Sequence, residues 1–328
     1  MKIHVCVAFL LLAMMLSGCG IPQGERQTEN HAYSVIDAEG AVVHIPHKPK
    51  RILPGNMTYD TLVLGLTTPD HVVAVNVLSK DPRSSFSAAE AKQVHRTVTS
   101  LTGISTTLVM EEKPDLILLP DYTDKNTVDM LRSLHFPVVI CKGPNTFEEI
   151  RGVIRLMAEA MGEKERGEKV VAEMDKTLAE TDAALAKIDG PRPSGLLVSQ
   201  MQSYGGAGSM YDELVKRARI DNALTKAGLK NGDYLSKEMV LKSDPDFFLI
   251  SAVKDGDLHQ QNQFTRGFFS DPALQWLKGA RKVIPLPNRY IYCGNQNCGW
   301  AVKALANAAY GPLFDMSGEY LVSAVKKE

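Results

Sequence analysis

The chain has 328 residues, of which 44% are hydrophobic, and a formal net charge of −1 at pH 7. Because single hydrophobic cores stop growing at roughly 250 to 300 residues, this length predicts two domains. The ordinary composition excludes the disordered and fibrous classes. No Lys and Arg cluster is interleaved with aromatic residues, which argues against nucleic-acid binding.

The first residues are typical of an exported lipoprotein. Lys2 precedes an apolar run, Val5 to Met15, that is too short for a mature membrane span, and Leu16-Ser17-Gly18-Cys19 follows it. This tetrapeptide resembles a bacterial lipobox, in which a signal peptide is cleaved before a cysteine that is then acylated. We expect a signal peptide at 1–18, a lipid on Cys19 and a tether at 19–31, so that the body works outside the cytoplasm, on a Gram-positive surface or in a periplasm. A plain signal peptide with a chance cysteine is the alternative.

Three further cysteines belong to the body of the protein: Cys141, Cys293 and Cys298. In an oxidising compartment the pair in "CGNQNC" could close a small disulfide ring, or the thiols could stay free. A zinc site is the weakest interpretation, because no other His or Cys ligand lies nearby in the sequence.

Apolar runs alternate with helical segments along the first half of the chain. A hairpin is predicted at 33–36 and 41–45, around the turn Asp37-Ala38-Glu39-Gly40. The strands and helices expected after it are 51–54, 58–64, 72–75, 116–119, 126–134 and 138–141. Strands that alternate with helices form right-handed βαβ units, so residues 32–162 predict an α/β lobe with a mainly parallel sheet.

The same pattern begins again after Gly190-Pro191-Arg192-Pro193. The expected elements are a strand at 196–199, a helix at 210–218, a helix and strand within 238–250, and a strand at 282–285. Residues 190–328 therefore predict a second lobe. The fold class is α/β, with two doubly wound lobes.

Between the lobes lies the most regular amphipathic segment of the chain. Apolar residues recur every three or four positions from Val171 to Ile188, and charged residues occupy the other positions from Glu163 onward. One helix of about 39 Å would cross from lobe to lobe at 1.5 Å per residue. We assign 163–189 to this interlobe helix. A coiled-coil dimer is the competing interpretation, although the pattern lasts under four heptads.

One phrase occurs twice, as "TLVMEEKPDLILL" at 107–119 and "EMVLKSDPDFFLI" at 238–250. In each, a helical run ends at Pro-Asp, and an apolar run typical of a buried parallel strand follows. The repetition indicates the same helix-to-strand transition in two similar lobes.

The order of the segments resembles one known family. "PKRILPGNMTYDTLVLGLTTPDHVVAV", "EEKPDLILLP", "SYGGAGSMYDELVKRARIDNAL", "YLSKEMVLKSDPDFFLIS" and "DPALQWLKGARKVIPLPNRYIY" follow the order of the iron-siderophore, cobalamin and haem substrate-binding proteins of ABC importers. The resemblance covers about residues 35–314. It implies two lobes joined by one long helix, a ligand in the cleft between them, small closure on binding, and a permease as partner.

The resemblance also implies a docking role for the repeated phrase. In the family, a glutamate on each lobe contacts arginines of the transporter. Counting back seven residues from each Pro reaches Thr107 and Glu238, and only Glu238 fits. Glu111 or Glu112, about one helical turn on, would have to replace Thr107.

The position of the ligand site is predicted from the expected α/β fold. In open parallel sheets, ligands lie at the carboxyl ends of strands, where loops and helix N-termini present unpaired N–H groups. Tyrosines and amides recur there, which suits a large, partly aromatic ligand, although each could also be a half-buried lobe residue. Met57 could ligate haem iron, but a methionine beside a strand end is more often core. The candidate ligand-binding residues are Asn56, Met57, Tyr59, Asn76, Tyr122, Tyr204, Gly205, Ser251 and Tyr292.

Catalytic and metal-binding patterns are weak. The glycine-rich run at 205–209 lacks the Lys-Ser/Thr of a P-loop, and the histidines are scattered singly without an HExxH motif. We therefore expect a monomeric binding protein without a cofactor or protein-bound metal ion, rather than an enzyme or a structural lipoprotein. The expected ligand is a metal chelate. An iron-siderophore complex is favoured, and a corrinoid or haem stays open.

Overall fold

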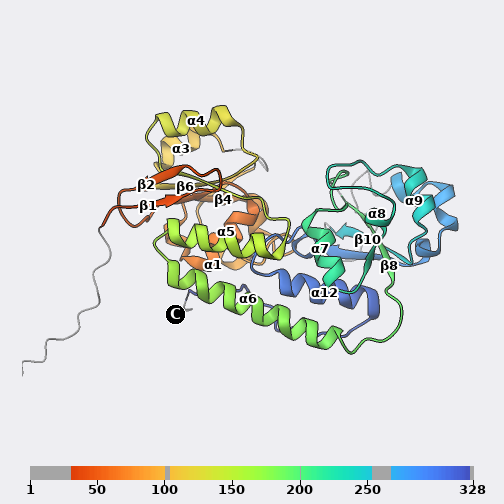
Figure 1. The fold of residues 1–328 in the computed structure, drawn as a ribbon. Coiled ribbons are helices and arrows are strands. Elements are labelled where there is room, and N and C mark those ends of the chain that lie inside the picture. Colours follow the sequence, from red (N-terminus) through yellow and green to blue (C-terminus); the bar gives the residue numbers. More distant parts are fainter. Residues whose placement is uncertain (1–30, 100–103, 200, 253–266, 326–328) are drawn as a thin grey trace, which may run out of the picture.

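The computed structural model describes residues 31–99, 104–199, 201–252 and 267–325, and shows two α/β lobes side by side (Figure 1). The helix α6 (Lys164–Leu185) runs beneath both lobes. The predicted α/β class with an interlobe helix is therefore confirmed. The predicted signal peptide, Cys19 and most of the tether lie outside the described residues.

The N-terminal lobe is built on a parallel sheet. Strand β6 (Leu116–Pro120) lies between β3 (Ile52–Pro54) and β7 (Val138–Cys141), and all three are parallel. A second parallel pair, β4 (Ala74–Asn76) and β5 (Arg96–Val98), joins β3 through the bond from the Val73 amide to the Ile52 carbonyl. The predicted hairpin is present as β1 (Tyr33–Ile36) and β2 (Val42–Ile45).

Helices cover both faces of this sheet. Leu116 and Leu118 belong to the core under α1 and α5, whereas Ile117 and Leu119 belong to the core under α3 and α4. Burial on both faces explains why β6 is apolar at every position. The helices of this lobe are α1 (Met57–Leu66), the 3₁₀ turns η1 (Pro69–His71) and η2 (Val77–Lys80), α2 (Ala88–Ala91), α3 (Thr106–Glu112), α4 (Lys125–Ser133) and α5 (Phe147–Ala160).

The C-terminal lobe has a parallel sheet with the order β11-β10-β8-β9. Its strands are β8 (Ser194–Val198), β9 (Asp221–Asn222), β10 (Phe247–Ala252) and β11 (Val283–Pro287). Its helical elements are α7 (Met210–Arg217), α8 (Ala223–Lys226), α9 (Lys237–Ser243), η4 (Pro272–Trp276), η5 (Lys278–Arg281), α11 (Asn288–Ile291) and α12 (Cys298–Tyr310).

The repeated phrase forms the same transition in both lobes, as predicted. Helices α3 and α9 end in left-handed residues, Lys113 (φ 45°) and Asp244 (φ 35°), before the Pro and the strand. The Asp115 carboxylate then accepts hydrogen bonds from the Lys50 and Arg51 amides at 2.9 and 2.8 Å. The Asp246 carboxylate accepts one from the Ser194 amide at 2.8 Å. Each Pro-Asp aspartate therefore binds the start of the neighbouring strand.

The lobes are joined by more than the interlobe helix. Helix α6 is 22 residues long, about 33 Å, and packs on α5 and α12. After α12 the chain returns to the N-terminal lobe, where the Ala324 amide donates to the Gly65 carbonyl at 3.0 Å. The last described residues thus contact α1, although the sequence pattern assigned all of 190–328 to the second lobe. In the described part of the chain, no helix is long and apolar enough to span a membrane.

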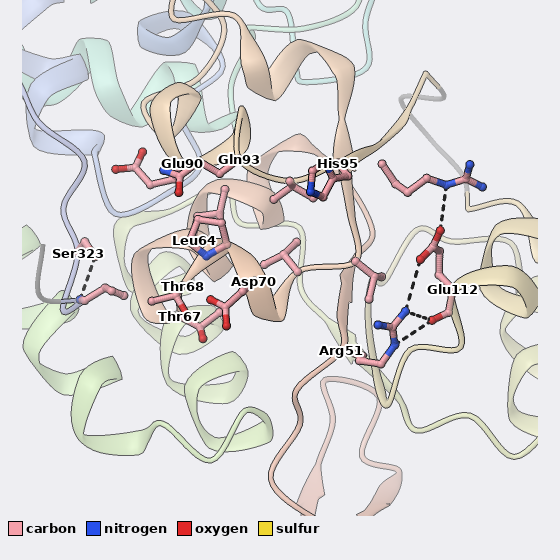
Figure 2. A pocket seen from close by; sticks show the side chains of 16 residues that line it. Arg51, Leu64, Thr67, Thr68, Asp70, Glu90, Gln93, His95, Glu112 and Ser323 are labelled. Carbon is pink, nitrogen blue, oxygen red and sulfur yellow. Dashed lines mark hydrogen bonds and ion pairs between the residues drawn. The ribbon is translucent and has the colours of Figure 1, made fainter. Parts of the chain in front are cut away.

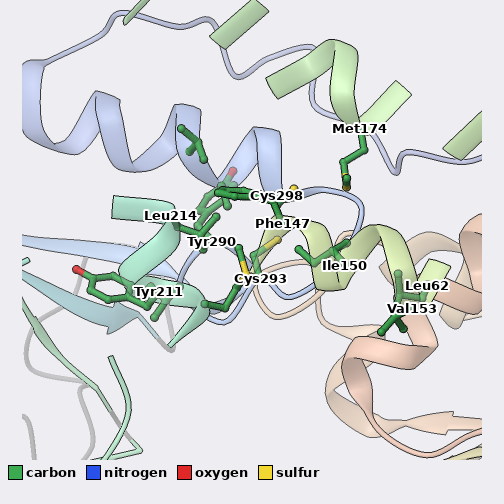
Figure 3. Packing of buried hydrophobic residues seen from close by; sticks show 14 of the residues in the cluster. Leu62, Phe147, Ile150, Val153, Met174, Tyr211, Leu214, Tyr290, Cys293 and Cys298 are labelled. Atoms are coloured by element: carbon green, nitrogen blue, oxygen red, sulfur yellow. The ribbon is translucent and has the colours of Figure 1, made fainter. Parts of the chain in front are cut away.

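The predicted alternative of a disulfide between Cys293 and Cys298 is wrong, because Cys141, Cys293 and Cys298 are all free thiols. Cys293 and Cys298 are buried among apolar side chains near Phe147 and Tyr290 (Figure 3). Burial raises the pKa of both thiols, to about 12 for Cys298, so they stay protonated and act as small apolar side chains.

Candidate functional site

A cavity of about 430 Å³ lies where the two lobes face each other. The N-terminal lobe contributes residues that follow β3, β6 and β7, and the C-terminal lobe contributes residues that follow β8 and α11. This placement agrees with the rule that ligands lie at the carboxyl ends of parallel strands. The cavity is lined by Asn56, Thr58, Tyr59, Asp121, Tyr122, Lys142, Gly143, Pro144, Asn145, Met201, Tyr204, Met210, Asn231, Tyr292 and Gly294. We call it the interlobe cleft.

The N-terminal wall is organised around a helix cap. Asn56 caps α1, because its Oδ1 accepts a hydrogen bond from the Tyr59 amide at 2.8 Å. Its Nδ2 donates to the Tyr122 hydroxyl at 3.0 Å, which leaves the Tyr122 ring 60% exposed at the cleft. Partial burial raises the pKa of Tyr122, so its hydroxyl is neutral at pH 7. This wall offers an aromatic face and neutral hydrogen-bonding groups.

The C-terminal wall carries a pair of tyrosines. The rings of Tyr204 and Tyr292 lie 5.2 Å apart at 47°. The Tyr204 hydroxyl donates to the Ile291 carbonyl at 3.3 Å, and the Tyr292 hydroxyl lies 2.9 Å from Ser199 Oγ. Both rings are therefore held in place, and half-exposed Met201 adds a flexible apolar contact beside them.

The cleft has little net charge in its described lining. Lys142 Nζ lies 2.5 Å from Glu149 Oε1, and this bond raises the pKa of Lys142. Asp121 Oδ1 accepts a hydrogen bond from the Gly143 amide at 3.1 Å. Neither arginine nor histidine is among the described residues that line the cleft. Within the described ranges, no group of three or more His, Cys, Asp or Glu could hold a metal ion.

Five of the nine predicted ligand residues line the cleft: Asn56, Tyr59, Tyr122, Tyr204 and Tyr292. Tyr59 is fully buried, and its hydroxyl donates to the Cys141 and Lys142 carbonyls at 2.9 and 3.0 Å. It therefore fixes the loop after β7 and presents no free donor to the cleft.

The other four predicted residues do not line the cleft. Met57 is the first residue of α1. Asn76 is buried, and its amide donates to Asp60 Oδ2. Gly205 has φ +114° beside Leu197 and Leu224, and Ser251 Oγ donates to Asn288 Oδ1. Asn76 ends β4 and Ser251 lies near the end of β10, and both are buried within their lobes.

Several lining residues are absent from the predicted set. Lys142 and Gly294 follow β7 and α11. Met201 precedes α7, Met210 begins it, and Asn231 follows α8. Lys142 directly follows the predicted strand β7, so the rule on strand ends could have identified it. Asn231 follows no predicted strand, so no pattern in the sequence indicates it.

A larger groove of about 1090 Å³ lies at the opposite, amino edge of the N-terminal sheet (Figure 2). Arg51 precedes β3 and Arg96 begins β5, and both bind Glu112 within this groove. The groove has a mixed lining, in which Leu64 and Val94 accompany these charged side chains, and it shares no residue with the interlobe cleft.

The predicted docking residues occupy different positions. Thr107 and Glu238 are each the second residue of equivalent helices, α3 and α9, and both are exposed. Glu111 and Glu112 lie at the other end of α3, where they pair with Arg96 and Arg51 beside the groove of Figure 2. They therefore do not replace Thr107 at the start of the helix.

Comparison with known proteins identifies the family. The family model described as "Periplasmic binding protein" matches residues 55–289, most of the chain and most of the residues that line the cleft. The chain belongs to the periplasmic binding protein family. Proteins of this family bind solutes, and those of ABC transporters work with a permease.

Two relatives of this periplasmic binding protein come from Bacillus subtilis (strain 168). The "Uncharacterized ABC transporter substrate-binding lipoprotein YvrC" is 28% identical over 258 residues, which is 74% of this chain and 78% of YvrC. The "Probable siderophore-binding lipoprotein YfiY" is 27% identical over 192 residues, 55% of each chain. The periplasmic heme-binding protein RhuT from Roseiflexus sp. RS-1 has the same fold, with a TM-score of 0.68 at 22% identity, covering 81% of this chain and 99% of RhuT.

Proposed function

We propose that this protein captures an iron chelate of the siderophore type in the interlobe cleft and delivers it to an ABC importer. The observation that carries the proposal is the cleft itself, which presents Tyr122 on one wall and the Tyr204–Tyr292 pair on the other in a periplasmic binding protein. Aromatic faces and neutral amides suit a bulky chelate that already satisfies its metal. The name of the relative YfiY supports the siderophore class.

Binding, rather than catalysis, follows from the same lining. The cleft has no paired nucleophile and base among its described residues, and its one lysine is bound to Glu149. We therefore assign no reaction and no cofactor. Haem is the second candidate ligand, because RhuT has this fold and is a heme-binding protein. A corrinoid is the third.

Calorimetric titration of the soluble body with ferrichrome, hemin and cobalamin tests the proposal. We expect ferrichrome to bind in the micromolar range or tighter, about −8 kcal/mol or better. Tyr122→Ala should weaken binding about two- to tenfold, because a lost aromatic contact is worth roughly 0.5–1.5 kcal/mol. Trp276→Ala is the control, since Trp276 is 91% exposed and does not line the cleft. Binding of none of the three ligands would contradict the function, and tighter binding of hemin or cobalamin would reassign the ligand.

We propose that the C-terminal lobe meets the permease through Glu238. Its carboxylate is exposed in the first turn of α9, after the Ser236 cap. An interfacial charge that faces an arginine can contribute about 1.5 kcal/mol or more. Glu238→Ala should therefore reduce stimulation of the transporter ATPase by ligand-loaded protein while ligand affinity stays unchanged.

Two further variants sharpen the docking test. Thr107→Glu should maintain or strengthen docking, because Thr107 occupies the same helical position in the other lobe. Glu180→Ala, at an exposed position of α6, is the matched control and should change nothing. Wild-type stimulation by the Glu238→Ala protein would exclude this docking role.

Membrane anchoring is proposed to depend on Cys19, which follows the apolar run as in a lipobox. Both Bacillus relatives are named as lipoproteins. Cys19→Ser should release the protein from membranes or leave it unprocessed. Normal processing with unchanged membrane fractionation would contradict the anchor.

A further inference from the structure

Arg289 bridges the two lobes from the C-terminal side. It lies on α11, and its amide donates to the Arg83 carbonyl at 3.0 Å. Its Nη1 donates to the neighbouring Pro82 carbonyl. Both acceptors belong to the loop between η2 and α2 of the N-terminal lobe. One residue therefore holds two consecutive carbonyls of the opposite lobe.

Aromatic rings enclose the same guanidinium. The Arg289 Cζ atom lies 4.7 Å from the centre of the Tyr290 ring and 5.7 Å from that of Phe86. The two rings meet edge to face at 5.8 Å. Phe86 comes from the N-terminal lobe and Tyr290 from the C-terminal lobe, so these contacts also cross the boundary. The planar guanidinium suits such a stacked site, and a lysine does not.

The C-terminal segment completes the cluster. Arg289 Nη2 lies 2.6 Å from Glu319 Oε2, and the Tyr290 hydroxyl donates to the same oxygen at 2.9 Å. The side chains of Arg289 and Glu319 are only 19% and 14% exposed. We call Arg289, Tyr290, Phe86 and Glu319 the interlobe latch.

The latch lies next to the cleft in the sequence and in space. Tyr292 and Gly294, which come three and five residues after Arg289, both line the cleft. A side chain built at Gly294 would contact Pro144 at 3.5 Å and Thr58 at 3.8 Å, so the walls almost touch there. A shift of α11 against the loop at 82–86 would therefore change the width of the cleft.

The free energy of the buried Arg289–Glu319 pair indicates that the latch fixes geometry rather than adds stability. A buried ion pair adds little net stability compared with an apolar pair of the same shape, although removal of one partner is costly. Here Arg289 Nε and Glu319 Oε1 are buried and have no hydrogen-bond partner among the described residues. The latch therefore costs free energy of folding, and its specific geometry is what it contributes.

We propose that Arg289 is a positioning residue that holds the two walls of the cleft at a fixed separation before the ligand arrives. The role of the latch in affinity rests on the proposed function, because a preorganised cleft loses less freedom on binding. Its effect on lobe geometry does not depend on the identity of the ligand.

The test compares variants that keep the charge balanced. Arg289→Met with Glu319→Gln removes the guanidinium contacts of the bridge but keeps the backbone bond to Arg83, leaves no unpaired charge and keeps an acceptor for Tyr290. The matched control is Arg151→Met with Asp175→Asn, which neutralises a bidentate pair between α5 and α6. Arg289→Lys serves as a second latch variant that retains the charge.

Lobe geometry is measured with spin labels on Lys125→Cys and Lys242→Cys of the soluble body, at exposed positions of α4 and α9. The native thiols within the described residues are buried. We expect one narrow distance distribution in the otherwise wild-type protein and in the control. In the latch variants the distribution should broaden or split, while the melting temperature stays close to that of the control. Affinity for ferrichrome should fall about tenfold, or ~1.4 kcal/mol.

An unchanged distance distribution in folded latch variants would overturn the positioning role. So would a broadened distribution without any loss of affinity in a protein that binds ferrichrome. If the wild-type protein binds none of the three chelates, the proposed function fails, and the distance measurement alone still decides whether Arg289 fixes the lobes.

Discussion

Asp60 is a carboxylic acid buried inside the N-terminal lobe, with 1% of its surface exposed. Its Oδ2 accepts hydrogen bonds from the Asn76 amide at 2.7 Å and from Ser79 Oγ at 2.6 Å. Burial raises the pKa of Asp60 from its ordinary value of 3.8 to about 7, although these two bonds act in the opposite direction. The residue therefore titrates near neutral pH in the folded chain.

The pKa of Asp60 predicts a pH-dependent stability. The folded pKa lies above the unfolded one, so the folded state binds the extra proton, and stability falls as pH rises from about 4 to about 7. Asp60→Asn mimics the protonated acid at every pH. Relative to wild type, its free energy of unfolding should increase by about 1 to 3 kcal/mol between pH 5 and pH 8.

Urea denaturation at the two pH values measures this difference. Asp129→Asn, at an exposed aspartate on α4, is the control and should give the same difference from wild type at both pH values. If the difference between Asp60→Asn and wild type were also equal at pH 5 and pH 8, Asp60 would be ionised throughout this range.

Single residues also mark the limit of prediction from sequence. Of the tyrosines and amides selected from strand ends, Asn56, Tyr122, Tyr204 and Tyr292 lie at the cleft. The same rule selected Asn76, which instead caps η2 with its side chain. Asn56 and Asn76 both lie at the carboxyl end of a strand and cap the helical turn that follows. The packing of each loop therefore decides whether the asparagine reaches the cleft.

At the scale of elements, the Pro-Asp aspartates tie each central strand to its neighbour. Asp115 holds two amides at the start of β3, and Asp246 holds one at the start of β8. Asp115→Ala and Asp246→Ala should each lower the free energy of unfolding by about 1 to 3 kcal/mol, because charged acceptors are lost from backbone donors.

Equilibrium unfolding in urea, with Asp129→Ala as the control, measures these losses. Asp115→Ala should lower the free energy of unfolding more through the strand contact than Asp246→Ala, because it leaves two backbone amides without an acceptor rather than one. Asp246 also pairs with Lys278, so Lys278→Met separates that surface pair from the backbone bond. Destabilisation no larger than that of the control would exclude the strand-tying role.

Element prediction succeeded where burial imposes a pattern. The apolar runs at β6, β7 and β10 are covered on both faces, and each was located from its sequence. The two-residue strand β9 and the short strand β5 were missed, because two or three residues carry no periodicity. The return of the C-terminal segment to α1 was also missed, since irregular chain has no pattern at all.

Among the described residues, three sets of contacts that join the two lobes bear on closure. Helix α6 packs along both, the Arg289 latch bridges α11 to the loop at 82–86, and the C-terminal segment binds α1. Gln296 strengthens the last connection, because its Nε2 donates to the Thr61 carbonyl at 2.7 Å. Hinge closure of one lobe over the other would have to disturb the contacts of the latch and of the C-terminal segment.

These connections predict that ligand binding changes the overall shape only slightly. Small-angle scattering of the soluble body with and without ferrichrome should give radii of gyration that agree within about 1 to 2 Å, a small fraction of the size of a compact chain of this length. Wide hinge closure, as in binding proteins whose lobes rotate about flexible linkers, would give a larger decrease. A decrease beyond that range would mean that the latch and the C-terminal segment release on binding, and the cleft could then not be preformed. The Arg289→Met and Glu319→Gln double variant provides the internal comparison, because loss of the latch should allow a larger change in radius than the wild-type protein shows.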